Sequence, residues 1–181
     1  MERMERIERI QLSALDSGML ERVKELYFSA FPEEERRPWE SLLAALADPA
    51  SGYEMRVYLL DGEFAGFISS WDLEGFRYIE HFATSPHLRG RGLGAKIIEQ
   101  ERKDCVLPLL LEVEPASTGD MARRRIGFYE RCGFTGHEDI PYRQPAYAEG
   151  LPAVELMLMT TGPIAEPEPL IRELHSRVYG A

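Results

Sequence analysis

The amino-acid sequence predicts an α/β (α+β) domain with a mixed, mostly antiparallel central sheet, a splayed parallel strand pair and helices on both faces. Two observations lead to this prediction. Residues 53–60 and 64–71 flank the dipeptide Asp61-Gly62, which tolerates the positive φ angles of a tight hairpin and so predicts antiparallel strands. From residue 91 the chain alternates between helical and extended patterns, which is typical of a parallel crossover unit.

The first half of the chain supplies the antiparallel part of this sheet. Alternating residues predict a first strand over residues 7–14, and apolar residues at helical spacing predict a helix from about residue 17 to residue 28. A charged loop, residues 31–38, leads to a second predicted helix over residues 39–47. After the hairpin, a Gly-containing turn precedes the third strand of the meander, residues 76–84.

The second half supplies the crossover. We expect a helix over residues 91–104, a very apolar strand over 106–114, a helix over 120–132 that ends at Gly133, and a last strand over 154–160. The sheet therefore changes from antiparallel to parallel between the two strands that flank the first of these helices. Neighbouring strands can splay at such a point and leave a crevice for a ligand.

The length favours one domain with a short extension. We assign residues 1–162 to the domain and residues 163–181 to a proline-rich linker with a short helix. The helix carries an apolar stripe of Leu170, Ile171, Leu174 and Val178, which could dock on the domain or on a partner.

Composition excludes several classes of protein. The 44% hydrophobic residues argue against a disordered chain, and the 29% charged residues with a mean hydropathy of −0.30 argue against a membrane-embedded one. No apolar run approaches the roughly 20 residues that cross a bilayer, and residues 1–9 are charged where a signal peptide is apolar. We therefore expect a cytoplasmic protein without a membrane partner.

Net charge and cysteine content argue against a nucleic-acid partner, a disulfide framework and a zinc site. The 21 basic and 31 acidic residues give 21 − 31 = −10, so the chain as a whole repels nucleic acid, and we expect no nucleic-acid partner. The two cysteines, Cys105 and Cys132, show neither a disulfide framework nor zinc-ligand spacing. We expect reduced thiols and no metal.

The most informative segment, Arg89-Gly90-Arg91-Gly92-Leu93-Gly94-Ala95, lies between a predicted strand and a predicted helix. This helix lacks an obvious capping residue, and glycine keeps its first amides free of side chains. Such amides at the positive end of a helix dipole, flanked by arginines, suit a phosphate or pyrophosphate. An ordinary basic surface turn is the alternative, because short glycine motifs also match by chance.

A dinucleotide-binding loop of the GxGxxA type is excluded by spacing. Its first glycine would follow the strand directly, whereas six residues, including Pro86, separate Ala83 from Gly90.

The segment resembles a known family. Arg89 to Gly94 matches the (Arg/Gln)xxGx(Gly/Ala) loop of the GNAT N-acetyltransferases, which binds the pyrophosphate of acetyl-CoA. The strand that ends at residues 82–84, the apolar strand 107–114, and the segment 125–134, with its Phe-Tyr and Gly-Phe pairs, are similar to that family's elements in their order. The resemblance covers roughly residues 7–160, with the specific motifs within 76–134.

The resemblance implies a binding mode for acetyl-CoA, the expected co-substrate. Its pantetheine arm would lie in the gap between strands 76–84 and 106–114. Main-chain groups of Phe82, Ala83 and Thr84 would contact it, and residues 89–95 would hold the pyrophosphate. A strand amide that points at the thioester carbonyl could also stabilise the developing oxyanion.

Two catalytic residues follow from the resemblance. Tyr129 matches the family's frequent general acid, which protonates the departing thiolate, although a core tyrosine is the alternative reading. Glu80 is the favoured base, because its position matches one where several members of the family place a glutamate or histidine, and burial there would raise the pKa of its carboxyl group. Glu112 and Glu114 are alternative bases, and Glu80 could instead pair with a nearby arginine.

The resulting hypothesis is an N-acetyltransferase that moves an acetyl group to a primary amine of a small molecule by direct attack on the thioester. Residues 31–39 and 142–147 would bind the acceptor. The alternative is a non-catalytic acyl-CoA sensor or regulatory module with the same fold, and we keep a homodimer open.

Overall fold

The computed structural model describes residues 6–181; residues 1–5, which belong to the charged start and to the domain range predicted as 1–162, lie outside the described residues. The first half of the chain forms β1 (Ile7–Gln11), α1 (Ser17–Ala30), η1 (Glu33–Glu35), α2 (Trp39–Ala47), β2 (Tyr53–Leu60), β3 (Glu63–Leu73) and β4 (Phe76–Thr84). The second half forms η2 (Pro86–Leu88), α3 (Leu93–Asp104), β5 (Leu109–Val113), η3 (Ala116–Thr118), α4 (Asp120–Arg131), β6 (Thr135–Gly136), β7 (Arg143–Gln144), β8 (Val154–Glu155), β9 (Met157–Thr160), α5 (Pro167–Leu174) and η4 (His175–Tyr179).

Hydrogen bonds join seven of the strands in the order β1-β2-β3-β4-β5-β9-β6, while β7 and β8 pair separately. The predicted hairpin is confirmed, because Leu60 pairs with Glu63 across the turn. Asp61 and Gly62 have φ angles of +50° and +88°, both in the left-handed region that a two-residue hairpin requires. The predicted parallel pair is also confirmed, with Arg77 opposite Leu109 and Tyr78 opposite Leu110. The fold is therefore the mixed, mostly antiparallel α/β sheet that the sequence predicts.

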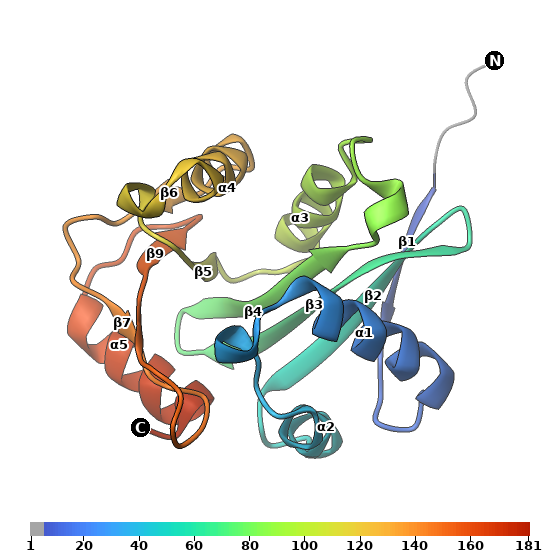
Figure 1. Cartoon of the computed structure of the whole chain (residues 1–181), viewed down its shortest axis with the longest axis horizontal. Coiled ribbons are helices and arrows are strands. Elements are labelled where there is room, and N and C mark those ends of the chain that lie inside the picture. Colours follow the sequence, from blue (N-terminus) through green and yellow to red (C-terminus); the bar gives the residue numbers. More distant parts are fainter. Residues whose placement is uncertain (1–5) are drawn as a thin grey trace. The chain divides into compact units, whose positions relative to one another are not determined.

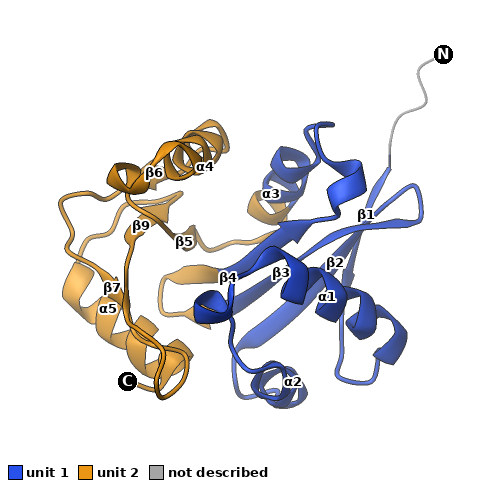
Figure 2. Ribbon diagram, viewed as in Figure 1, with its two compact units in different colours: residues 1–71, 80–100 blue, residues 72–79, 101–181 orange. Residues whose placement is uncertain are grey.

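The chain divides into two compact units, coloured blue and orange in Figure 2. Unit 1 runs to Trp71 and also contains Glu80–Gln100, and unit 2 contains Asp72–Ile79 and Glu101–Ala181. These bounds differ from the predicted domain of residues 1–162 and the predicted extension of residues 163–181. That division of the chain stays a prediction.

Unit 1 is built on strands β1 to β4. Figure 1 shows α1 and α2 on one face of these strands and α3 on the other. The core side chains of this unit are fully buried and apolar, and they come from every layer: Val23, Met55, Val57, Ile68, Ile97 and Ile98. Each such side chain stabilises the fold by about 1.5–3 kcal/mol relative to an exposed one.

Unit 2 is built on β5, which pairs with the first residues of β4 on one edge and antiparallel with β9 on the other. Figure 2 shows α4 and α5 on opposite sides of these strands. Leu170, Leu174 and Val178 are buried, so the C-terminal stripe docks within this unit.

Several boundaries differ from the sequence predictions; the first strand, for example, ends at Gln11 rather than at residue 14. The strand expected from Val106 begins only at Leu109, and the Val106 side chain is 100% exposed. Pro108 has no N–H for a strand ladder, so the apolar run does not continue as a strand through it. The last strand breaks at Leu156 into β8 and β9, which pair in different sheets. The tail helix begins at Pro167, before the apolar stripe that starts at Leu170, because proline suits the first turn of a helix.

Candidate active site

The glycine-rich loop of unit 1 joins η2 to α3. Gly90 and Gly92 have φ angles of +79° and +68°, so both occupy the left-handed region, where a side chain would be strained. A Cβ atom added at either glycine would meet no described atom within 4 Å. The loop backbone is therefore open in the direction of each missing Cβ atom.

The rest of the loop fixes this backbone at the start of a helix. Leu93 is the first residue of α3 and is buried, whereas Arg89, Arg91 and Ala95 are exposed and Gly94 is half-buried. The first N–H groups of a helix lack intrahelical acceptors and lie at the positive end of its dipole. The predicted cofactor loop, residues 89–95, thus has the local geometry of an anion site.

Residues Phe82, Ala83 and Thr84 end β4, which is the edge strand of unit 1. Ala83 is buried, while Phe82 and Thr84 are half-exposed. Strand β3 lies close to the inner edge of β4. A Cβ atom added at Gly66 of β3 would lie only 2.4 Å from the carbonyl oxygen of Ala83. The contact of these residues with the pantetheine arm stays a prediction.

Glu80, also on β4, has a fully buried side chain that is held by two neighbours. The Arg37 guanidinium donates to its Oε1 from Nε at 3.0 Å and from Nη2 at 2.9 Å, and Trp71 Nε1 donates to its Oε2 at 2.7 Å. Burial opposes the charge, yet Arg37, His81 and Trp71 together lower the pKa of Glu80 below its usual value. The expectation that the pKa is raised is therefore wrong, because Arg37, His81 and Trp71 together outweigh desolvation, which is the largest single influence.

His81 follows Glu80 on β4, and strand alternation would place the two side chains on opposite faces of the sheet, yet their polar atoms lie close together. Its Nδ1 is 3.9 Å from Glu80 Oε2, and its Nε2 is 3.0 Å from the carbonyl oxygen of Glu35. Burial lowers the pKa of His81, although the charge of Glu80 opposes this effect. Both side chains contact the segment 35–37, so strict strand alternation does not separate them.

Tyr129 in unit 2 is the predicted acid and lies near the end of α4. Its half-exposed ring packs against Phe128 and Phe134, with centroid distances of 5.1 and 5.4 Å. Burial, partly offset by Arg125, raises the pKa of Tyr129 to about 12. Within residues 6–181 its hydroxyl makes no hydrogen bond, so a neutral donor is available there.

Glu112 on β5 is the centre of a second polar cluster in unit 2. Its Oε2 accepts hydrogen bonds from the hydroxyls of Tyr78 at 2.9 Å and Tyr179 at 2.8 Å, and its Oε1 accepts one from the hydroxyl of Tyr142. Glu114, the other alternative base, is 41% exposed and lies 3.8 Å from Arg125. Of the two alternative bases, Glu112 therefore lies among hydrogen-bonding side chains, whereas Glu114 is partly exposed.

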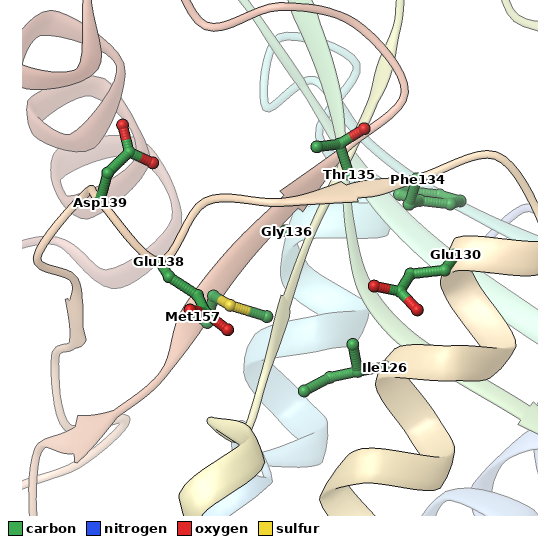
Figure 3. A pocket seen from close by; sticks show the side chains of 8 residues that line it. All are labelled: Ile126, Glu130, Phe134, Thr135, Gly136, Glu138, Asp139 and Met157. Carbon is green, nitrogen blue, oxygen red and sulfur yellow. The ribbon is translucent and has the colours of Figure 1, made fainter.

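Figure 3 shows a hollow in unit 2 at the end of α4 that is not part of either cluster. Its lining comprises Ile126, Glu130, Phe134, Thr135, Gly136, Glu138, Asp139 and Met157. None of the predicted site residues lines this hollow, and we assign it no catalytic or binding role. Among the described residues no three His, Cys, Asp or Glu side chains gather to hold a metal, and no helix is long and apolar enough to cross a bilayer.

The alternative that Glu80 pairs with a nearby arginine is confirmed by its ion pair with Arg37, whereas sequence reasoning missed Trp71 and the partners of Glu112. Arg37 and Trp71 come from a loop and from β3, and Tyr78 and Tyr179 lie 101 residues apart in the chain. Arg37 and Tyr142 belong to the two segments predicted to bind the acceptor, residues 31–39 and 142–147. The others are brought to their carboxylates by tertiary packing, which leaves no local pattern.

Comparison with known proteins gives consistent matches. Residues 51–136 match the family model described as the acetyltransferase (GNAT) domain. A solved structure from Bacteroides thetaiotaomicron, provisionally named a GNAT-family acetyltransferase, is 35% identical, covers 96% of this chain and 99% of its own, and superposes with a TM-score of 0.90. YjbC of Bacillus subtilis (strain 168), provisionally named an acetyltransferase, is 27% identical over 82% of this chain and 74% of its own. The ribosomal-protein-S18-alanine N-acetyltransferase of Escherichia coli has the same fold at 18% identity, with 89% and 97% of the two chains covered and a TM-score of 0.56.

Proposed function

The chain belongs to the GNAT family of acetyltransferases, and from this premise we propose that it transfers an acetyl group from acetyl-CoA to a primary amine of a small molecule. The observation that supports this most directly is the loop of residues 89–95. Its two left-handed glycines leave the backbone open, and its exposed arginines would balance the charge of a pyrophosphate. The residues present therefore fit the group that the family uses.

The bound acetyl-CoA supplies the acetyl group in activated form, as a thioester. The attacking nitrogen must be neutral, and the departing sulfur must be stabilised as its bond to the carbonyl carbon breaks. Tyr129 is the proposed donor to that sulfur. Because the pKa of Tyr129 is about 12, above the 8.5 typical of a thiol, its hydroxyl stays protonated and stabilises the sulfur chiefly by donating a hydrogen bond.

For the base, the geometry supports Glu112 better than Glu80. The carboxylate of Glu80 is ion-paired with Arg37, and its lowered pKa weakens it as a proton acceptor. Glu112 is held by neutral tyrosine hydroxyls, whose hydrogen bonds lower its basicity less than the full positive charge of Arg37 lowers that of Glu80. We propose Glu112 as the residue that receives the proton of the acceptor's ammonium group, and Glu80 as an anchor for the segment 35–37.

The proposed acceptor is cationic before it reacts. A chain with a net charge of −10 attracts ammonium ions over a long range. Residues 31–39 and 142–147 stay the segments proposed to bind this acceptor.

The test is the release of free thiol from acetyl-CoA in the presence of a panel of primary amines. Amine-dependent release by the wild type supports the enzyme, whereas saturable binding of acetyl-CoA without release under every amine would favour the acyl-CoA sensor. Glu112→Gln is expected to lower kcat/KM at least 100-fold. Glu80→Gln is expected to lower it less than 10-fold, and the reverse order would return the role of base to Glu80.

A further inference from the structure

The hydroxyls around Glu112 come from three distant parts of unit 2. Tyr78 lies on β4, Tyr142 follows β6, and Tyr179 is the last residue of η4. The hydroxyl oxygens of Tyr78 and Tyr179 are 3.0 Å apart, and each is within 2.9 Å of Glu112 Oε2. The C-terminal segment, residues 163–181, thus contributes a polar atom at the proposed base.

The Oε2 atom of Glu112 and the hydroxyl oxygens of Tyr78 and Tyr179 form a triangle that holds two hydroxyl protons. When both tyrosines donate to Glu112, no proton lies between their own hydroxyls. When Tyr179 donates to Tyr78 instead, Tyr78 still donates to Glu112. In both arrangements the hydroxyl of Tyr179 stabilises the negative charge of the carboxylate, directly or through Tyr78.

Packing holds Tyr179 in this place. The apolar side chains of Leu174 and Val178 are buried in unit 2. Arg177 Nη1 donates to the carbonyl oxygen of Asp72 at 2.5 Å, and the amide of Glu74 donates to Glu173 Oε1 at 2.9 Å. The ring of Tyr147 lies 5.1 Å from that of Tyr179. These contacts anchor the C-terminal segment next to the carboxylate.

We propose that Tyr179 is a positioning residue for Glu112, so that the C-terminal segment is part of the catalytic apparatus rather than an appendage. Its hydroxyl holds the carboxylate in one orientation and favours the charged form. The proposal rests on the role of Glu112 under the proposed function.

Other titratable groups near this carboxylate, among the described residues, include Tyr78 from β4, Tyr142 and Tyr147 from the segments after β6, and His175 from η4. Burial, and then the charge of Glu112, raises the pKa values of Tyr142 and Tyr179. Burial lowers the pKa of His175, whose ring lies 5.5 Å from that of Tyr142. Through the range in which a carboxylate titrates, the two tyrosines therefore stay protonated donors.

The experiment uses the full chain and Tyr179→Phe, which removes one oxygen atom and keeps the ring. The carboxyl carbon of Glu112 is followed by 13C NMR as the pH changes, and its resonance is assigned by its absence in Glu112→Gln. Loss of a donor to a carboxylate raises the midpoint of its titration. We expect an upward shift of about one pH unit, smaller than for an isolated bond because Tyr78 still donates.

Ser176→Ala is the matched control, because it removes a hydroxyl of the same turn that bonds to the carbonyl oxygen of Glu173. We expect no shift in this control. An unchanged midpoint in Tyr179→Phe, or an equal shift in Ser176→Ala, would overturn the proposal.

The pH profile of kcat/KM distinguishes a failure of this proposal from a failure of the proposed function. In an active enzyme, the acid limb of the kcat/KM profile should move upward with the NMR midpoint in Tyr179→Phe. A moved midpoint with an unmoved limb would overturn the positioning role and leave acetyl transfer intact. If the wild type releases no thiol, the proposed function fails, and the NMR midpoint alone decides whether Tyr179 controls the charge of Glu112.

Discussion

Replacing Arg37 with methionine should destabilise the fold strongly, because it leaves Glu80 buried without its cation. The Glu80 side chain is 0% exposed and that of Arg37 is 14% exposed. Removing one partner of a buried ion pair costs about 3–5 kcal/mol. Because Arg37 retains some contact with solvent, we expect a loss of about 3 kcal/mol in the free energy of unfolding at pH 7.

The loss should depend on pH. In the wild type, the folded-state pKa of Glu80 lies below its usual 4.5, so its stabilising contribution is present above pH 4.5 and is lost as the pH falls through the lowered value. Without Arg37, burial remains as the largest influence and raises the folded-state pKa. Arg37→Met should therefore gain stability as the pH falls from 7 toward 4.5, and its deficit should shrink.

Urea unfolding at pH 7 and pH 4.5 measures both effects, with unchanged m-values as the check that only stability has changed. Arg36→Met is the matched control. Arg36 lies 4.8 Å above the ring of Phe28, a contact worth less than about 1 kcal/mol at a half-exposed site. Adding Glu80→Gln to Arg37→Met should restore most of the lost stability at pH 7. The reasoning is refuted if Arg37→Met is as stable as Arg36→Met at pH 7.

Two further predictions concern the predicted cofactor loop and the predicted acid. Gly92→Ala should weaken acetyl-CoA binding at least 10-fold in a calorimetric titration, because its Cβ atom would occupy the open side of the loop, whereas Gly62→Ala, with comparable strain at φ +88°, should bind like the wild type. Equal affinity in the two variants would argue against the loop as the pyrophosphate site. Tyr129→Phe should lower kcat about 10–100-fold with little change in acetyl-CoA affinity, and the wild-type kcat should show no alkaline loss from Tyr129 below about pH 11, because its pKa is about 12. An unchanged kcat in Tyr129→Phe would remove this residue from the mechanism.

Local chemistry explains why so much of the fold could be predicted. Asp61-Gly62 adopts the left-handed angles that a tight hairpin needs, and no distant residue is required for that choice. The apolar spacing of Leu170, Leu174 and Val178 likewise marks a buried helix face. Val106 shows the limit of this reasoning, because its apolar side chain predicts burial but lies outside the strand that begins after Pro108.

The candidate site likewise has one part that local sequence predicts and another that depends on the tertiary structure. The sequence alone determined the loop of residues 89–95, since backbone angles, helix amides and flanking charges are all local properties of that segment. Only the tertiary structure decided which carboxylate carries a counter-ion. Arg37 reaches Glu80 across 43 residues, and Tyr179 reaches Glu112 across 67. The basicity of a carboxylate depends on burial and on the charges and donors around it, and for both residues these are set by segments that meet only when the chain folds.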